Sequence, residues 1–240
     1  MDRIAIAIVG GGSVHWTPAI GRDLLLTPAL ANAEITLLDV DRPAAERTRA
    51  FLEKLAAQLG VKPKIRATDR LDGLRGARYV VITISTGGLD AMRHDLAIPE
   101  RFGIYHTVGD TSGPGGWARL IRNFDVFAGL ARAINRYAPG AFVLNYTNPM
   151  TTLTDVLARL CTGPVIGLCH GLFENLALIR RLYGLEDESA IAVRYAGLNH
   201  FFWITEARAG GVDVLADCAR RLRTQSFTDL LREAYRDQMG

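Results

Sequence analysis

Cysteine is scarce in this chain of 240 residues, and the three present, Cys161, Cys169 and Cys218, are an odd number. So few thiols argue against a disulfide framework and favour a reducing, cytoplasmic setting. No uninterrupted apolar run approaches the ~20 residues that a membrane-spanning helix needs. The N-terminus also lacks the pattern of a signal peptide. We therefore expect no membrane partner.

The chain also has almost no excess of charge of one sign. The formal net charge is +3, and the arginines are scattered along the chain. A nucleic-acid-binding protein needs a basic face, so no nucleic-acid partner is expected. Apolar residues make up 49% of the chain and charged residues 22%, as in an ordinary soluble globular protein. The length suits one large domain, or one domain and part of a second.

Strand and helix patterns alternate through most of the chain. Short apolar, β-branched runs predict strands, and apolar side chains three and four residues apart predict helices. The expected strands are 3–9, 34–39, 64–67, 79–84, 141–145 and 164–168, and the expected helices are 17–26, 42–59, 120–137 and 149–160. This order predicts an α/β fold, with a Rossmann-like, doubly wound, mainly parallel sheet in a domain of residues 1–190.

Two of the expected helices begin at prolines. Thr17-Pro18 offers an N-cap and a first-turn proline, and Asn148-Pro149 offers the same for the helix that ends near Leu160.

The pattern changes near residue 190. The runs Ile191–Ala196 and Phe201–Ala207 predict paired strands, and Asp213–Arg223 and Phe227–Met239 have helical spacing. We expect residues 191–240 to begin a second α/β (α+β) substrate domain, the rest of which would lie beyond the end of this chain.

The first strand runs into a glycine-rich loop. Gly10 and Gly12 allow a tight strand-to-helix turn, and the loop through Ser13 lets backbone amides approach a pyrophosphate. The third glycine of the dinucleotide-binding fingerprint is replaced by His15. Asp39, at the end of the second predicted strand, could bind a ribose and repel a 2′-phosphate, which favours NAD over NADP. A glycine turn without ligand and a solvated Asp39 are the alternative.

Cys169 and His200 each follow a strand-like run, in Gly167-Leu168-Cys169-His170-Gly171 and Gly197-Leu198-Asn199-His200. At strand ends facing one crevice, a thiolate and an imidazole could hold a divalent metal and leave its other positions open. Their separation matches no spacing rule for metal sites. A small buried cysteine and a hydrogen-bonded structural histidine therefore stay open as the alternative.

Together with Gly109–Gly116 and Asn145–Pro149, these motifs resemble the NAD- and manganese-dependent glycosidases of glycoside hydrolase family 4. The motifs follow one another in the family's order and cover nearly the whole chain. The resemblance implies a Rossmann-like domain followed by an α/β substrate domain. It also implies NAD and Mn²⁺, or another divalent metal, as cofactors.

The reaction that the resemblance implies is a redox route to cleavage of an O-glycosidic bond, an exception to the usual pair of carboxylates. NAD oxidises the sugar at carbon 3, the new ketone acidifies the proton on carbon 2, and elimination expels the leaving group from carbon 1. Water then adds, and NADH returns the hydride. The metal polarises the ketone as a Lewis acid.

Five residues acquire roles from the resemblance. Cys169 and His200 would be the metal ligands. Asp110 would orient a substrate hydroxyl or a ligand histidine, and Asn148 would contact a substrate hydroxyl and the cofactor. Arg93 would contact the substrate. The plainer interpretations are an Asx turn for Asp110, a helix cap for Asn148 and a solvated loop arginine for Arg93.

His170 follows the cysteine, where some members of the family carry the acid that protonates the leaving oxygen. It could equally be a substrate contact beside the metal ligand. The Cys-His-Gly sequence resembles the branch that acts on α-linked, unphosphorylated sugars, so an α-galacturonide or α-glucuronide is expected. α-Glucosidase, α-galactosidase or phospho-glycosidase activity is the alternative within the family. The family's tyrosine base is expected beyond Gly240, since Tyr235 lies in an ordinary amphipathic pattern.

Two other classes of function stay open. One is an NAD-dependent hydroxy-acid dehydrogenase of the lactate/malate type, which would use no metal and would produce net NADH. The other is a truncated, non-catalytic NAD-binding domain. A homodimer or homotetramer is expected if the chain is an enzyme of the family.

Overall fold

The computed structural model describes residues 3–106 and 108–236 and divides the chain into two compact units, Met1–Leu168 and Cys169–Gly240. The division precedes the boundary predicted near residue 190. Helix α6 (Gly171–Leu182) causes the difference, because its Ile179 packs with Ile191 and Ala207 in the core of the second unit.

The first unit contains a sheet of six parallel strands in the order β3-β2-β1-β4-β5-β6. The strands are β1 (Ala5–Val9), β2 (Glu34–Leu38), β3 (Lys64–Thr68), β4 (Tyr79–Ile82), β5 (Phe142–Asn145) and β6 (Val165–Gly167). The predicted Rossmann-like sheet is confirmed. The strand order reverses between β1 and β4, which is where such folds bind their ligands.

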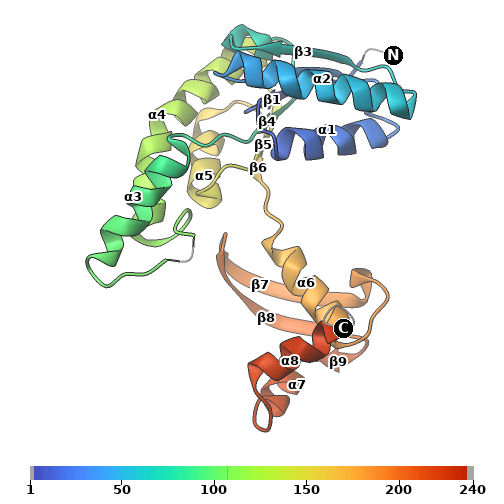
Figure 1. Ribbon diagram of the computed structural model, residues 1–240, viewed down its shortest axis with the longest axis vertical. Helices are drawn as coiled ribbons and strands as arrows, with labels where there is room; N and C mark the ends of the chain where they lie inside the picture. The colour runs from blue at the N-terminus through green and yellow to red at the C-terminus, as the bar shows by residue number, and fades with distance from the viewer. Residues whose placement is uncertain (1–2, 107, 237–240) are drawn as a thin grey trace. The chain divides into compact units, whose positions relative to one another are not determined.

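Helices cover both faces of this sheet (Figure 1). Helices α1 (Trp16–Leu26) and α2 (Arg42–Leu59) pack on one face, and α4 (Gly113–Tyr137) and α5 (Met150–Leu160) pack on the other. The period-2 alternation of strand side chains explains how both layers form. In β1, Ile6 and Ile8 pack with α1 and α2, whereas Ala7 and Val9 pack with α4 and α5.

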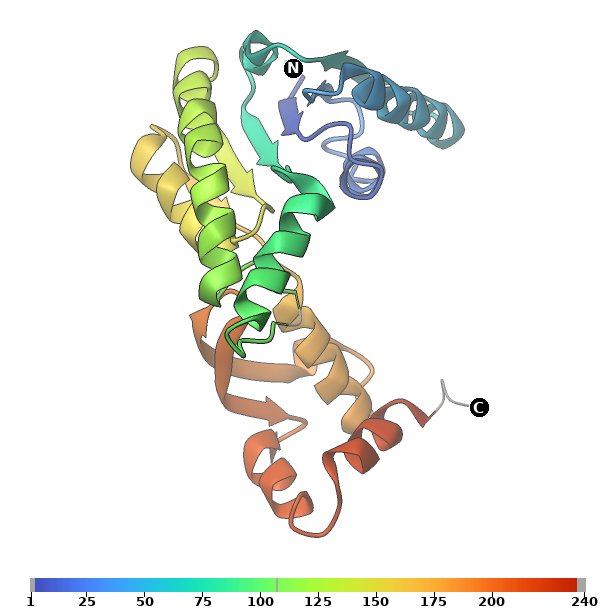
Figure 2. The same ribbon diagram turned by 60° about the vertical axis from the view of Figure 1, so that its left-hand side comes forward.

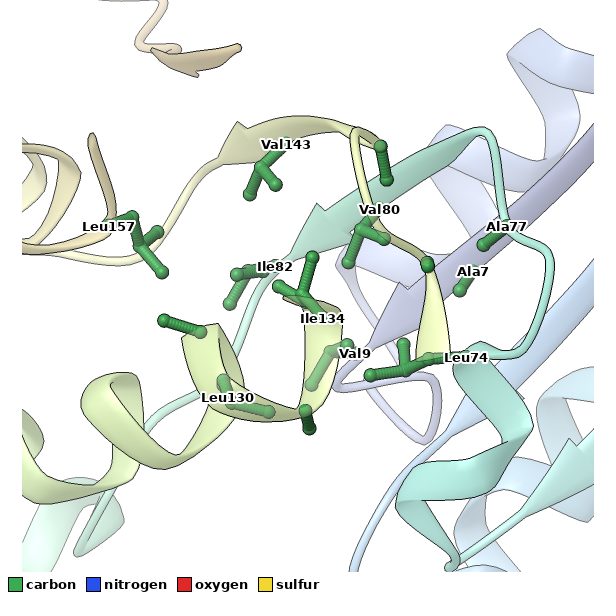
Figure 3. Packing of buried hydrophobic residues seen from close by; sticks show 14 of the residues in the cluster. Ala7, Val9, Leu74, Ala77, Val80, Ile82, Leu130, Ile134, Val143 and Leu157 are labelled. Atoms are coloured by element: carbon green, nitrogen blue, oxygen red, sulfur yellow. The ribbon is translucent and has the colours of Figure 1, made fainter. Parts of the chain in front are cut away.

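Figure 3 shows the core on the α4 and α5 face. Aliphatic side chains from strands and helices pack together there; those labelled include Val9, Val80, Ile82, Val143, Leu130, Ile134 and Leu157. The carboxyl ends of β1, β4 and β5 lie in register, because Val9 pairs with Ile82 and Ile82 with Asn145.

Helix α3 (Gly88–Glu100) was not predicted, and α4 begins earlier than the predicted residue 120. The two helices lie side by side (Figure 2). Their N-terminal residues are rich in glycine, a poor helix former. The beginnings of both helices could therefore not be recognised from the sequence. A buried ion pair between Asp95 of α3 and Arg122 of α4 joins them. A short 3-10 helix, η1 (Leu71–Leu74), lies between β3 and β4.

The second unit has an antiparallel sheet of β7 (Ile191–Leu198), β8 (Phe201–Ala209) and β9 (Val212–Asp213). The predicted strand pair is confirmed. The remaining elements are α6, the 3-10 helix η2 (Glu188–Ala190), α7 (Val214–Arg221) and α8 (Phe227–Ala234). Helix α8 ends at Ala234, with Tyr235 at its C-cap, so it is shorter than predicted; the predicted end at Met239 lies outside the described residues. No helix in the described ranges is both long and apolar enough to cross a bilayer.

Candidate functional site

The glycine-rich loop begins where β1 ends. Gly10 has a φ of 93°, and a Cβ there would lie 2.0 Å from the carbonyl oxygen of Thr83. A Cβ on Gly12 would lie 2.7 Å from the Cβ of Ala44 and 2.9 Å from the Oδ2 atom of Asp39. Only glycine fits these two positions. The loop thereby forms a close-packed backbone cradle before the N-terminus of α1, as a pyrophosphate requires.

Asp39 directly follows β2 and faces this loop. Its Oδ2 atom accepts a hydrogen bond of 2.8 Å from the Gly12 amide, and its Oδ1 atom accepts one of 3.0 Å from the Asp41 amide. A carboxylate has about four lone-pair sites, so both oxygens can accept further hydrogen bonds from a ribose. The glycine cradle and this carboxylate fit a dinucleotide.

The start of α1 differs from the prediction for Thr17-Pro18. The helix begins at Trp16, whose amide donates to the Ser13 hydroxyl at 3.0 Å, and His15 occupies the N-cap position. Thr17 is fully buried, and its hydroxyl donates to the Gly10 carbonyl at 3.2 Å. Thr17 is therefore not a cap, because the glycine-rich loop takes its hydroxyl.

Asp110 and Asn148 lie together, although 38 residues separate them. The Asn148 amide donates to the Oδ2 atom of Asp110 at 2.9 Å, and the Arg119 guanidinium donates to the Asn148 carbonyl at 3.1 Å. The prediction that Asn148 caps α5 is wrong, because Pro149 holds the N-cap position and the helix starts at Met150. The structure thus pairs a carboxylate and an amide that could both contact a sugar hydroxyl.

Arg93 lies in helix α3 and not in a loop. Its guanidinium is exposed and lies 3.8 Å from the carboxylate of Asp90. His170 is also exposed and occupies the N-cap position of α6. Its Nε2 atom lies 3.2 Å from the Oε1 atom of Glu174.

Cys169 and His200 meet within the second unit. The Sγ atom of Cys169, just before α6, lies 3.4 Å from the Nε2 atom of His200. His200 is in the two-residue turn between β7 and β8, where Leu198 pairs with Phe201. Its φ of 62° makes it the one non-glycine residue with a positive φ in the described ranges. Such strained positions are rare and cluster at functional sites.

This pair suits a shared divalent cation. Ligand atoms at about 2.3 Å (sulfur) and about 2.1 Å (nitrogen) from one ion, at about 90° to 110°, lie about 3.1 to 3.6 Å apart. The observed 3.4 Å falls within this interval. No group of three or more His, Cys, Asp or Glu side chains suited to a metal occurs in the described part of the chain. Two protein ligands would leave coordination positions for a substrate.

Two side chains at these sites were missed in the sequence. Arg119 holds the Asn148 carbonyl, and Thr48 of α2 donates to the Gly11 carbonyl at 2.5 Å. Neither lies in a recognisable motif. Both act on backbone carbonyls of distant loops, a contact that no spacing rule reports.

Similarity to known proteins shows the family of this chain. The model of the family 4 glycosyl hydrolases matches residues 5–184. The chain belongs to this family. It is 38% identical to the alpha-galacturonidase of Bacillus subtilis (strain 168) over 224 residues, which cover 90% of this chain and 49% of that relative.

Solved structures of similar proteins agree with this placement in family 4. The crystal structure of lplD from Bacillus subtilis has a TM-score of 0.80 at 36% identity and covers 92% of this chain and 52% of that one. A 6-phospho-alpha-glucosidase from gut microorganisms, solved with NAD and glucose-6-phosphate, has a TM-score of 0.80 at 25% identity. That match covers 93% of this chain and 51% of that one. The chain spans about half the length of the curated family 4 relatives it matches.

Proposed function

We propose that this chain provides the cofactor- and metal-binding part of an NAD- and divalent-metal-dependent glycosidase that cleaves α-galacturonides. The observation that carries the proposal is the 3.4 Å contact between Cys169 and His200 in a chain of family 4. The other support comes from the glycine-rich loop, from the Asp110–Asn148 pair and from the names of the relatives.

NAD would be held by the first unit. The amides of the loop from Gly10 to Ser13 would face the pyrophosphate, and Asp39 would accept hydrogen bonds from the adenosine ribose. The similar 6-phospho-alpha-glucosidase was crystallised with NAD. A carboxylate at Asp39 repels a 2′-phosphate, so NAD and not NADP is the proposed cofactor.

A divalent cation, Mn²⁺ in the first instance, would be held by Cys169 and His200. When bound, NAD would supply an oxidant for a sugar hydroxyl and the metal a Lewis acid for the resulting carbonyl. Thiolate and imidazole leave open coordination positions, which two neighbouring sugar oxygens could fill. The chain's two ligands would thus bind and orient the substrate as well as the metal.

The remaining site residues would position the sugar and move one proton. Asn148, fixed by Asp110 and Arg119, would contact a sugar hydroxyl near the cofactor. The His170 imidazole would protonate the leaving oxygen. The planar guanidinium of Arg93 is suited to a uronate carboxylate. The tyrosine base of the family has no proposed counterpart among the residues of this chain.

The α-galacturonide is proposed because the B. subtilis relative at 38% identity is an alpha-galacturonidase. The alpha-galacturonidase of Thermoanaerobacterium saccharolyticum is 36% identical to this chain. An α-glucuronide differs only in the orientation of one hydroxyl and is the second substrate to test. A homodimer or homotetramer remains a prediction.

A panel of 4-nitrophenyl α-galacturonide, α-glucuronide and α-glucoside tests the proposal, with NAD, Mn²⁺ and a thiol reductant added singly and together. Because this chain offers no counterpart of the family's tyrosine base, we expect slow cleavage, of the α-galacturonide only, with both NAD and Mn²⁺ present and no net NADH. Cleavage that survives chelation and removal of NAD would contradict the mechanism. Net NADH without cleavage would favour a hydroxy-acid dehydrogenase.

A further inference from the structure

The peptide bond between Gly11 and Gly12 is held at both ends. The Thr48 hydroxyl of α2 donates to the Gly11 carbonyl at 2.5 Å, and the Gly12 amide donates to the Oδ2 atom of Asp39 at 2.8 Å. A continuous hydrogen-bonded chain therefore runs from a helix hydroxyl, through one peptide group, to the carboxylate that faces the glycine-rich loop.

Thr48 is built into this position. It is only 4% exposed, and its hydroxyl also lies 3.0 Å and 3.4 Å from the Ala45 and Ala44 carbonyls of its own helix. A threonine in a helix usually donates to such a carbonyl one turn earlier. Here the shortest contact is the one to Gly11, and a hydroxyl has a single proton to donate.

A second buried hydroxyl acts on the neighbouring carbonyl. Thr17 of α1 donates to the Gly10 carbonyl at 3.2 Å, next to the bond that Ser13 makes with the same oxygen at 3.0 Å. The negative ends of two consecutive loop peptides are thus bound by the protein's own donors. An anionic ligand of the loop would otherwise be repelled by any carbonyl that turned toward it.

We propose that Thr48 is a positioning residue for Asp39. It would hold that carboxylate in the orientation in which it accepts hydrogen bonds from the adenosine ribose. The inference rests on the NAD site proposed above. A peptide group is planar, so its carbonyl and its N–H turn as one unit. Fixing the Gly11 carbonyl fixes the direction of the Gly12 N–H, and with it the Oδ2 atom. The Asp41 amide fixes the Oδ1 atom.

Calorimetric titration of the 240-residue chain with ADP-ribose and with its 2′-deoxyadenosine analogue tests this role. The analogue lacks the 2′-hydroxyl, from which Asp39 would accept a hydrogen bond. Thr48→Val keeps the branched shape and removes the donor. Because one buried hydrogen bond contributes about 1 kcal/mol, we expect ADP-ribose to bind about 3- to 10-fold more weakly. The analogue should bind Thr48→Val as tightly as it binds the unaltered chain. The ratio of the Kd of the analogue to the Kd of ADP-ribose should therefore be smaller in Thr48→Val.

Two further variants separate positioning from mere stability. Thr48→Ser retains the hydroxyl and should restore the preference. Thr27→Val removes a hydroxyl that donates to the Asp23 carbonyl at 2.7 Å, away from the glycine-rich loop, and should leave it unchanged. If Thr48→Val does not fold, Thr48→Ala takes its place with the same expectation.

A Thr48→Val or Thr48→Ala variant with a lower Tm but an unchanged preference for ADP-ribose over the analogue would overturn the inference and leave the NAD site standing. Failure of the unaltered chain to bind NAD or ADP-ribose would overturn the NAD site as well. Absence of glycosidase activity would bear on the proposed function alone, because the titration does not involve turnover.

Discussion

The Sγ atom of Cys169 lies 3.4 Å from the Nε2 atom of His200, although 31 residues separate them in the chain. One side chain precedes helix α6, and the other projects from the tight turn between β7 and β8. Both belong to the second unit, so the contact needs no residue of the first. His200 has a left-handed φ of 62° in this turn, a conformation that has a backbone cost for residues other than glycine.

The strain gives the first prediction. An L-residue in the left-handed region costs about 1 kcal/mol relative to glycine, and His200 has a φ of 62°. His200→Gly should therefore have a free energy of unfolding about 1 kcal/mol larger than that of His200→Ala, and its urea midpoint should be correspondingly higher. Both variants lack the imidazole, so the comparison isolates the backbone. Equal stabilities of the two variants would argue against strain in the turn.

Cofactor selectivity should depend on Asp39. Asp39→Asn keeps the shape and removes the charge that repels a 2′-phosphate. We expect the ratio of the Kd values for NADP and NAD to fall by about tenfold, which corresponds to about 1.4 kcal/mol. Calorimetric titration with both nucleotides measures it.

Asp41→Asn is the matched control for Asp39→Asn. Asp41 caps α2 by accepting a hydrogen bond from the Ala44 amide, and asparagine caps equally well. An equal change of selectivity in Asp41→Asn would mean that general charge, and not the position of Asp39, sets the preference.

The ion pair between α3 and α4 should matter for stability. The Asp95 side chain is 5% exposed and pairs with Arg122, and its Oδ2 atom has no hydrogen-bond partner within the described ranges. Arg122→Met would leave a buried carboxylate without its cation, which should cost about 3 kcal/mol. Adding Asp95→Asn should recover part of the loss. Urea denaturation measures each change.

An exposed pair provides the comparison for that loss. Arg159 and Asp155 form a solvent-exposed ion pair on α5, and Arg159→Met should change the free energy of unfolding by less than about 1 kcal/mol. Similar effects of the two arginine substitutions would contradict a special contribution from the buried pair.

The contribution of the Tyr183 hydroxyl to stability should depend on pH in the alkaline range. Burial first, and then the hydrogen bond that its hydroxyl donates to Asp217, raise the pKa of Tyr183 above its usual value. A raised pKa in the folded state stabilises the protein fully below the unfolded value of about 10, and this contribution is lost as pH rises from there. The unaltered chain should therefore lose stability more steeply than Tyr183→Phe above about pH 10. Parallel curves from urea denaturation would contradict this.

The elements that followed from the sequence are those whose pattern is local. Buried apolar runs predicted β1, β2, β4 and β5 of the first sheet, and Gly10, Gly12 and Asp39 lie where the Rossmann-like pattern puts them. Helix α6 could also have been found, since Leu172, Leu176 and Ile179 recur at spacings of four and three. Its packing on β7 would then have moved the boundary toward Leu168.

The parts that could not be predicted depend on contacts between distant segments. Asn148 has the local features of a helix cap, and only the fold of the loop before α4 brings Asp110 to its amide. Thr17 likewise precedes a proline, as caps do, yet its hydroxyl is drawn to the Gly10 carbonyl. Competition between a local hydrogen bond and a tertiary one is not visible in the order of residues.

Cobalt titration of the chain tests the central claim most directly, because Co²⁺ bound by a thiolate gives an intense charge-transfer absorption in the near ultraviolet. We predict that the band forms with one equivalent of Co²⁺, is abolished by Cys169→Ser, and is weakened by His200→Ala. It should persist in Cys218→Ser, the matched control in the same unit, and decline when Mn²⁺ competes. No band in the unaltered chain, or a band that survives Cys169→Ser, would contradict a metal site at Cys169 and His200.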